Sequence, residues 1–154
     1  MINYRMATAE DAPLLARVRM DFLREANGSL SLAEADDLLA ANTAYLSRAL
    51  ADGSFLSWMA LEDGNIAGTS GVSFYTLPPN RSCPDGKTAY ISNMFTYPAY
   101  RGGGIATRLF AMTVDAAAQK GHRNICLSAT KMGRPLYEKY GFKDAHDFMA
   151  YRAE

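Results

Sequence analysis

The chain has 154 residues, the usual size of one domain, and its 16 basic and 16 acidic side chains cancel, which leaves no electrostatic attraction toward nucleic acid or an anionic membrane. Apolar residues make up 49% of the sequence, yet no run approaches the roughly 20 apolar residues of a membrane span. The start, MINYRMATAEDAP, carries charges and no apolar stretch like that of a secretory signal, so we expect a single cytoplasmic domain over residues 1–154.

The first elements in the chain are predicted to be a strand and a helix. A short strand is expected near Asn3–Met6. Thr8 and Asp11 then form a capping-box pattern with the shorter acid, which marks a helix start. Apolar residues recur at helical spacing up to a stop at Gly28: Leu14, Leu15, Val18 and Phe22.

A second helix and a hairpin follow. Ser31 and Glu34 repeat the capping pattern and open a helix that runs to Gly53. From residue 54 the apolar period changes to two, and Asp63-Gly64 suits the tight turn of a hairpin between two strands. The three prolines of residues 76–87 indicate a loop.

The second half alternates strands and helices. A strand is expected at Thr88–Thr96, and a helix that ends near Gly121 follows, with a buried stripe of Ile105, Leu109, Met112 and Ala116. Residues 124–129 predict a short strand, and GRPLYEKYGF a brief helix that Gly141 ends. The tail to Tyr151 predicts one or two more strands, so the order is β-α-α-β-β-β-α-β-α-β.

The stretch YRGGGIAT places three glycines directly before a helix. The first turn of a helix leaves about four N–H groups without partners and carries about half a positive charge. Glycines there let the backbone approach phosphate oxygens, which indicates a pyrophosphate site at Gly102–Gly104. The alternative is a tight strand-to-helix turn. A dinucleotide fingerprint fails because Thr107 replaces its third glycine, and the Gly-Lys-Ser/Thr of a Walker loop is absent.

The longer string NMFTYPAYRGGGIATRLF, followed by LYEKYGF, resembles the GNAT superfamily of acetyl-CoA-dependent N-acetyltransferases. Arg101, Gly104 and Ala106 occupy the defining places of the family's Arg/Gln-x-x-Gly-x-Gly/Ala motif. Pro98 and the element at Tyr137–Phe142 are also similar to that family. The resemblance implies an α/β fold of the α+β type, with a mixed, mostly antiparallel sheet flanked by helices.

The resemblance also implies a site. In the family the fourth strand carries a bulge and splays from the fifth, and the pantetheine arm enters the gap. By position this implies cofactor contacts from Met94, Phe95 and Thr96, with an N–H there polarising the acetyl carbonyl. It implies pyrophosphate contacts from the backbone of Arg101, Gly102, Gly103, Gly104, Ile105, Ala106 and Thr107. Tyr137 matches the acid that protonates the departing thiolate; the alternative is a core aromatic.

Several other residues have plainer interpretations. We expect the Arg101 side chain to lie in solvent, with phosphate contact through its N–H, and Arg108 to lie at the surface. His122 is expected to interact favourably with the helix dipole at the C-terminal end of a helix, and His146 is expected to be structural. The family often has Asn at the position of Thr130, so that cofactor contact is open. Asn93 and Ser128 are candidates to hold a water that accepts the amine proton, or are simply polar strand residues.

The predicted function is transfer of an acetyl group from acetyl-CoA to a primary amine by direct attack in a ternary complex. The alternatives are a non-catalytic acyl-CoA sensor or scaffold and a transferase for another acyl-CoA. Acetyl-CoA is the co-substrate. No metal is expected, because Cys83 and Cys126 do not have the spacing to any histidine that metal ligands show. The partner is a small-molecule or peptide amine, with no nucleic acid or membrane, and a homodimer is compatible with the resemblance. Acidic residues at the second helix start would suit a cationic amine, or merely favour the helix N-terminus: Glu34, Asp36 and Asp37.

Overall fold

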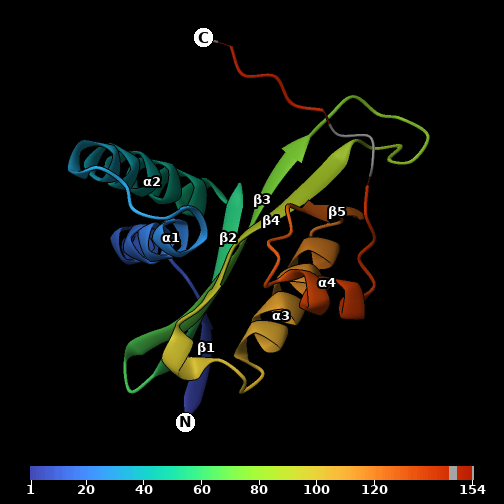
Figure 1. Ribbon diagram of the computed structural model, residues 1–154. Helices are drawn as coiled ribbons and strands as arrows, with labels where there is room; N and C mark the ends of the chain where they lie inside the picture. The colour runs from blue at the N-terminus through green and yellow to red at the C-terminus, as the bar shows by residue number, and fades with distance from the viewer. Residues whose placement is uncertain (146–148, 154) are drawn as a thin grey trace.

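The computed structural model describes residues 1–145 and 149–153 and contains a five-stranded sheet with helices on both faces (Figure 1). The strands are β1 (Ile2–Met6), β2 (Phe55–Glu62), β3 (Asn65–Thr76), β4 (Lys87–Thr96) and β5 (Asn124–Leu127). The helices are α1 (Ala12–Asn27), α2 (Leu32–Asp52), α3 (Ile105–Gln119) and α4 (Arg134–Tyr140), with 3-10 turns at Ala9–Asp11 and Pro98–Tyr100. Helices α1 and α2 cover one face of the sheet, and α3 and α4 cover the other.

The strands lie side by side in chain order. β1, β2, β3 and β4 pair antiparallel, whereas β4 and β5 pair parallel. Parallel neighbours need a crossover connection, and α3 supplies it between β4 and β5. The predicted mixed, mostly antiparallel sheet flanked by helices is therefore confirmed.

Local capping residues set most of the element ends, as the sequence predicts. Ser31 accepts the Glu34 N–H at 3.3 Å and donates its own N–H to the Glu34 carboxylate at 3.0 Å, which starts α2. The turn between β2 and β3 has φ of 50° at Asp63 and 82° at Gly64. These left-handed angles are the ones that a tight hairpin turn requires, so the hairpin prediction is confirmed.

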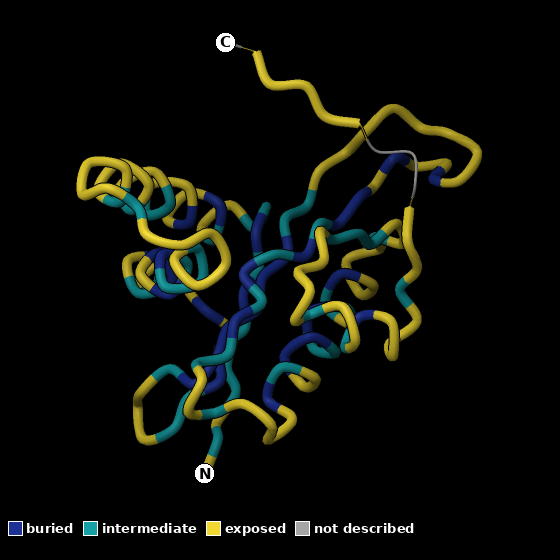
Figure 2. Tube along the Cα trace, in the orientation of Figure 1, coloured by how far each residue is buried: buried dark blue, intermediate teal, exposed yellow. Residues whose placement is uncertain are grey.

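The core lies on both faces of the sheet (Figure 2). The buried face of α3 differs in part from the predicted stripe: Ile105, Leu109, Phe110, Thr113 and Ala117 are buried, and Met112 and Ala116 only half-buried. The reason is that α3 packs against α4 as well as the sheet, with the Phe110 ring 5.0 Å from the Tyr137 ring. Thr113 tolerates this burial because its hydroxyl lies 2.6 Å from the Ser70 hydroxyl.

The strands expected before Tyr151 do not occur in the described residues 142–145 and 149–153, so that prediction is wrong for them. Phe142 packs its ring 5.3 Å from Phe110, and Asp144 pairs with Arg134 at 2.7 Å, so residues 142–144 are held against α3 and α4. Met149 and Tyr151 are more than 90% exposed, so these apolar side chains do not pack against the sheet as residues of a further strand would. His146 lies outside the described residues.

No described helix is long and apolar enough to cross a membrane. Cys83 and Cys126 are free thiols, and burial raises the pKa of both, so they are protonated near neutral pH. No group of three or more His, Cys, Asp or Glu in the described part of the chain could hold a metal ion.

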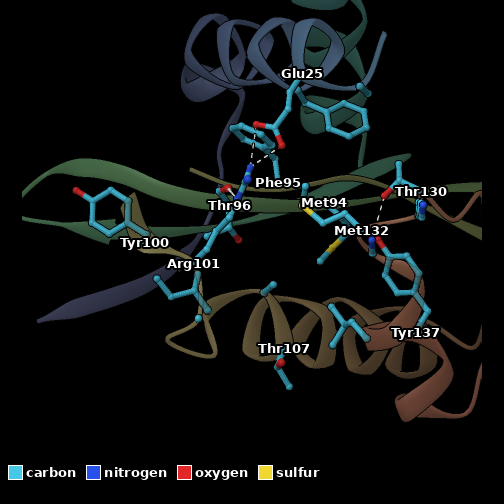
Figure 3. A pocket seen from close by; sticks show the side chains of 18 of the residues that line it. Glu25, Met94, Phe95, Thr96, Tyr100, Arg101, Thr107, Thr130, Met132 and Tyr137 are labelled. Atoms are coloured by element: carbon cyan, nitrogen blue, oxygen red, sulfur yellow. Dashed lines mark hydrogen bonds and ion pairs between the residues drawn. The ribbon is translucent and has the colours of Figure 1, made fainter. Parts of the chain in front are cut away.

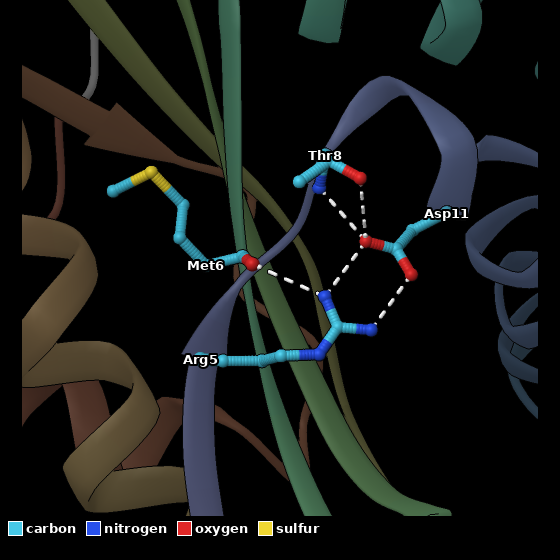
Figure 4. A network of polar contacts seen from close by, with 4 residues as sticks. All are labelled: Arg5, Met6, Thr8 and Asp11. Atoms are coloured by element: carbon cyan, nitrogen blue, oxygen red, sulfur yellow. Dashed lines mark hydrogen bonds and ion pairs between the residues drawn. The ribbon is translucent and has the colours of Figure 1, made fainter.

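An ion pair joins β1 to the start of α1 (Figure 4). The two terminal nitrogens of Arg5 donate to the two carboxylate oxygens of Asp11 at 2.8 and 2.7 Å. Asp11 also accepts the Thr8 N–H at 2.8 Å, the reciprocal half of the predicted cap. The Arg5 hydrogen bonds, with the Thr8 N–H, lower the pKa of Asp11 to about 2.

We expect Asp11→Asn to lower the free energy of unfolding at pH 7 by about 1–2 kcal/mol, because it removes charge-assisted hydrogen bonds and keeps the side-chain shape. The lowered pKa means that the carboxylate stabilises the fold above its usual pKa, and this stabilisation is lost as the pH falls toward 2. The difference in the free energy of unfolding between wild type and Asp11→Asn should therefore shrink as the pH is lowered from 5 to 2.5. Urea unfolding measures this difference.

Glu10→Gln is the matched control because Glu10 is the exposed neighbouring acid. A gap between wild type and Asp11→Asn that stays constant over this pH range would contradict the assigned role of the Asp11 charge.

Candidate active site

The middle of β4 carries a bulge that turns its side chains. Ser92 pairs with Gly71 and Phe95 with Thr69, so Ser70 alone faces both Asn93 and Met94. Asn93 has a left-handed φ of 54°, and its carbonyl accepts the Thr69 hydroxyl at 2.9 Å. Because of the extra residue, Ser92 and Asn93 both line a cavity on the α1–α2 side, while Met94 packs with the cluster under α3 and α4.

Beyond the bulge, β4 parts from β5. Their pairing ends at Ile91 and Leu127, so the following residues of β4 have no partner strand on that side. A cavity of about 640 Å³ occupies the gap (Figure 3). The bulge and the splay are the two features that the family resemblance implies.

Most of the residues named from the sequence line this one cavity. They are Met94, Phe95, Thr96, Arg101, Gly102, Gly104, Ile105, Ala106, Thr107 and Tyr137. Gly103 is the exception, since it lies outside the lining. Three elements therefore converge here: the end of β4, the start of α3 and the helix α4 (Figure 3).

The glycines shape the loop in front of α3. Gly102 and Gly104 have φ of 82° and 81°, a conformation that costs other residues free energy. The first hydrogen bond within the helix runs from the Arg108 N–H to the Gly104 carbonyl at 3.1 Å. The amides of Ile105, Ala106 and Thr107 precede it and have no acceptor within the helix. Gly102 and Gly104 leave open space where a Cβ would stand, so these amides can meet an anion.

Arg101 has a different partner from the one expected. One terminal nitrogen donates to both oxygens of the Glu25 carboxylate at 2.7 and 2.9 Å, and Nε donates to the Thr96 carbonyl at 2.8 Å. Arg101 is exposed, as expected, but its guanidinium is also paired, which the sequence did not predict because Glu25 on α1 comes within reach only in the folded chain. Arg101 ties α1 to the loop before α3 and also lines the cavity.

Tyr137 lies both in the core and at the cavity. Its ring belongs to the core, and it is also part of the cavity wall. Burial raises the pKa of the phenol, so the hydroxyl keeps its proton at neutral pH. Gly133 lies against the ring, where an added Cβ would come within 2.8–3.0 Å of it and of its hydroxyl.

Thr130 also lines the cavity. Its hydroxyl oxygen accepts the Gly133 N–H at 3.1 Å, which leaves the hydroxyl proton to donate elsewhere. Eight lining residues were not predicted from the sequence: Phe22, Glu25, Ala26, Tyr100, Lys131, Met132, Gly133 and Leu136. Phe22 and Glu25 come from α1, and no local pattern places that helix beside the loop before α3.

The remaining candidates lie outside this cavity. Arg108 is exposed and stacks on the Tyr4 ring at 4.2 Å, and Ser128 lines neither of the two cavities. Burial against Phe74 lowers the pKa of His122, so the expected charge at the end of α3 is wrong: the neutral imidazole is favoured. The acidic residues at the start of α2 are exposed and line neither cavity: Glu34, Asp36 and Asp37.

Comparisons with known proteins agree with this geometry. Residues 17–142 match the model of the Acetyltransferase (GNAT) family. An uncharacterized N-acetyltransferase of Escherichia coli (strain K12), YjgM, is 26% identical over 144 residues, covering 90% of this chain and 80% of that protein.

Two solved structures are similar over nearly the whole chain. A predicted acetyltransferase from Clostridium acetobutylicum, solved with acetyl-CoA, has a TM-score of 0.90 and 34% identity, covering 99% of this chain and 96% of its own. A GCN5-related N-acetyltransferase from Ralstonia eutropha JMP134 has a TM-score of 0.89 and 28% identity, with 100% of both chains covered.

We expect Gly104→Glu to weaken acetyl-CoA binding at least tenfold, or by about 1.4 kcal/mol, because bulk and a negative charge would stand where the amides face the cavity. Isothermal titration calorimetry with acetyl-CoA measures this. Gly64→Glu is the control, since Gly64 has the same left-handed φ of 82° and an open site outside the cavity lining. Unchanged affinity in a folded Gly104→Glu protein would exclude this loop as the phosphate site.

Proposed function

The chain belongs to the GNAT acetyltransferase family, and from this premise we propose that it transfers an acetyl group from acetyl-CoA to a primary amine by direct attack in a ternary complex. One observation carries the proposal. The parted edge of β4, the amide-rich start of α3 and the Tyr137 phenol line a single cavity. A bound thioester would therefore meet a phosphate site, an N–H donor and an acid in one place. In this proposal residues 1–154 act as one domain.

The first step is binding. The amides from Arg101 to Thr107 hold the pyrophosphate, with the positive end of the α3 dipole behind them. The pantetheine arm then lies along β4 beside Met94, Phe95 and Thr96, where its amides replace the missing partner strand. Thr130 donates its free hydroxyl proton to this arm. The carbonyl of the thioester thereby reaches the bulge.

The second step is the chemistry. The neutral amine attacks the acetyl carbon, a C–N bond forms, and the negative charge that develops on the carbonyl oxygen is stabilised by a backbone donor, a role that we assign to the Met94 N–H. The amine loses a proton to solvent. Collapse of the intermediate breaks the C–S bond, and Tyr137 gives its proton to the departing sulfur. The raised pKa of Tyr137 keeps that proton available at neutral pH.

We expect Tyr137→Phe to lower kcat by about 100-fold, at the lower end for a general acid because the CoA thiolate is a tolerable leaving group. The affinity for acetyl-CoA and the melting temperature should stay close to wild type, since the ring and its packing remain. Thiol release at saturating acetyl-CoA measures kcat, and calorimetry measures binding.

Undiminished kcat in Tyr137→Phe, where chemistry limits the rate, would remove Tyr137 from the mechanism. Wild-type protein that binds acetyl-CoA but acetylates nothing in a broad amine screen would instead indicate an acyl-CoA sensor.

A second variant displaces the same hydroxyl without removing it. Gly133 has ordinary helical angles, so Gly133→Ala meets no backbone strain, but the new Cβ would press on the Tyr137 ring. We expect at least a tenfold lower kcat, measured by the same assay. In the Tyr137→Phe background the same change should cost much less, because the two substitutions act on one group. Additive losses in the double variant would contradict this coupling.

A further inference from the structure

A second cavity of about 320 Å³ lies on the opposite side of β4, between the sheet and helices α1 and α2. Its polar lining includes Arg19, Asn42, Tyr45, Tyr90, Ser92 and Asn93. Among the described residues that line it, Arg19 is the only one with a charged side chain. The cavity therefore offers one cation surrounded by hydroxyls and amides.

Arg19 differs from Arg5 and Arg101 in its partners. Arg5 pairs with Asp11 and Arg101 with Glu25, each at 2.7 Å. Arg19 is half-buried, yet its guanidinium donates a hydrogen bond to a neutral group, from one terminal nitrogen to the Asn93 side-chain oxygen at 2.6 Å. No carboxylate in the described part of the chain forms an ion pair with it.

A half-buried charge without a counter-charge is costly. Burial lowers the pKa of Arg19, which reflects the loss of water around the guanidinium. The group nevertheless stays protonated, and it has five N–H donors, of which the Asn93 contact uses one. An anion that enters this cavity would supply the missing charge and accept the remaining donors.

We propose that this cavity binds the carboxylate of the acceptor, so that the substrate is a free amino acid or another compact amine that carries a carboxylate. The proposal rests on the proposed acetyltransferase function and adds the chemical class of the acceptor. A carboxylate fits better than a phosphate group because its single charge matches the single cation, and its two oxygens match the planar fork of a guanidinium.

The position of the cavity supports a compact acceptor. Asn93, which holds Arg19, is the chain neighbour of Met94, whose N–H we assign to the acyl oxygen. Consecutive strand residues lie about 3.3 Å apart, so only a few bonds are needed between the bound carboxylate and the attacking amine. Arg19 lines this cavity, and Phe22, one turn later on α1, lines the larger cavity.

The test uses the purified full chain, acetyl-CoA and matched pairs of acceptors. Each common amino acid is compared with its own carboxamide, which keeps the amine and side chain and removes the negative charge. Thiol release gives kcat/KM, and mass spectrometry identifies the product. We expect the preferred amino acid to exceed its carboxamide at least about 100-fold, because the carboxamide leaves the buried cation unpaired.

Substitutions then assign the preference to Arg19. Arg19→Gln should lower kcat/KM for the amino acid at least about 30-fold, mainly through KM, and leave the carboxamide unchanged, since only the amino acid loses an ion pair. Arg19→Lys should restore part of the preference. Arg17→Gln is the control, because it removes the same charge from an exposed position on the same helix. Calorimetry with acetyl-CoA should give wild-type affinity for each variant.

The outcomes separate the two proposals. If amines are acetylated without preference for a carboxylate, or if Arg19→Gln slows the amino acid and its carboxamide equally, the carboxylate site is wrong and the acetyltransferase function stands. A binding measurement by saturation-transfer NMR with the CoA-bound protein covers the opposite case. Amino acids that bind in preference to their carboxamides, with no acetylated product, would support the site and overturn the proposed function.

Discussion

The left-handed residue Asn93 is the constraint on which both cavities depend. A φ of 54° at a residue other than glycine costs about 1 kcal/mol, and it inserts one extra residue into a strand that is otherwise regular. The Thr69 hydroxyl holds the backbone there by donating to the Asn93 carbonyl at 2.9 Å, whereas Arg19 donates only to the Asn93 side chain, at 2.6 Å. Without the extra residue, the alternation of β4 would exchange the faces of Asn93 and Met94. The bulge therefore places Asn93, rather than Met94, at the α1–α2 cavity.

Helix α1 connects the same two cavities. Its Arg19 reaches Asn93, its Phe22 ring packs 6.2 Å from the Phe95 ring, and its Glu25 pairs with Arg101. The Glu25–Arg101 pair is about one-third exposed, so it contributes at most about 1 kcal/mol, and the aromatic contact adds a comparable amount. A small shift of α1 would therefore move the walls of both cavities together. The geometry of the acyl site and of the α1–α2 cavity cannot be set independently.

The parts of the fold that could be predicted from the sequence are those with local causes. Ser31 and Glu34 lie three residues apart, and Asp63-Gly64 is a dipeptide, so the cap and the turn depend on short segments. The resemblance to a family also allowed the splayed strand to be predicted, because the glycine-rich motif that directly follows this strand marks its position in the sequence. What failed has distant causes. Arg101 meets Glu25 across 76 residues, and the ring that packs against His122 is that of Phe74, on a strand far back in the chain.

The contact between Arg19 and Asn93 shows why acceptor chemistry is the hardest part to predict. The two residues are 74 positions apart, and each has an ordinary local environment: an arginine on an amphipathic helix and an asparagine in a strand. The cofactor site is different, because most of its groups come from consecutive backbone amides that a glycine-rich motif reveals. An acceptor site built from single side chains on α1, α2 and β4 leaves no such continuous pattern. Relatives can therefore share the acyl-transfer machinery and still differ in the amine that they accept, since one substitution at a position such as Arg19 changes the charge of the second cavity without altering the motif.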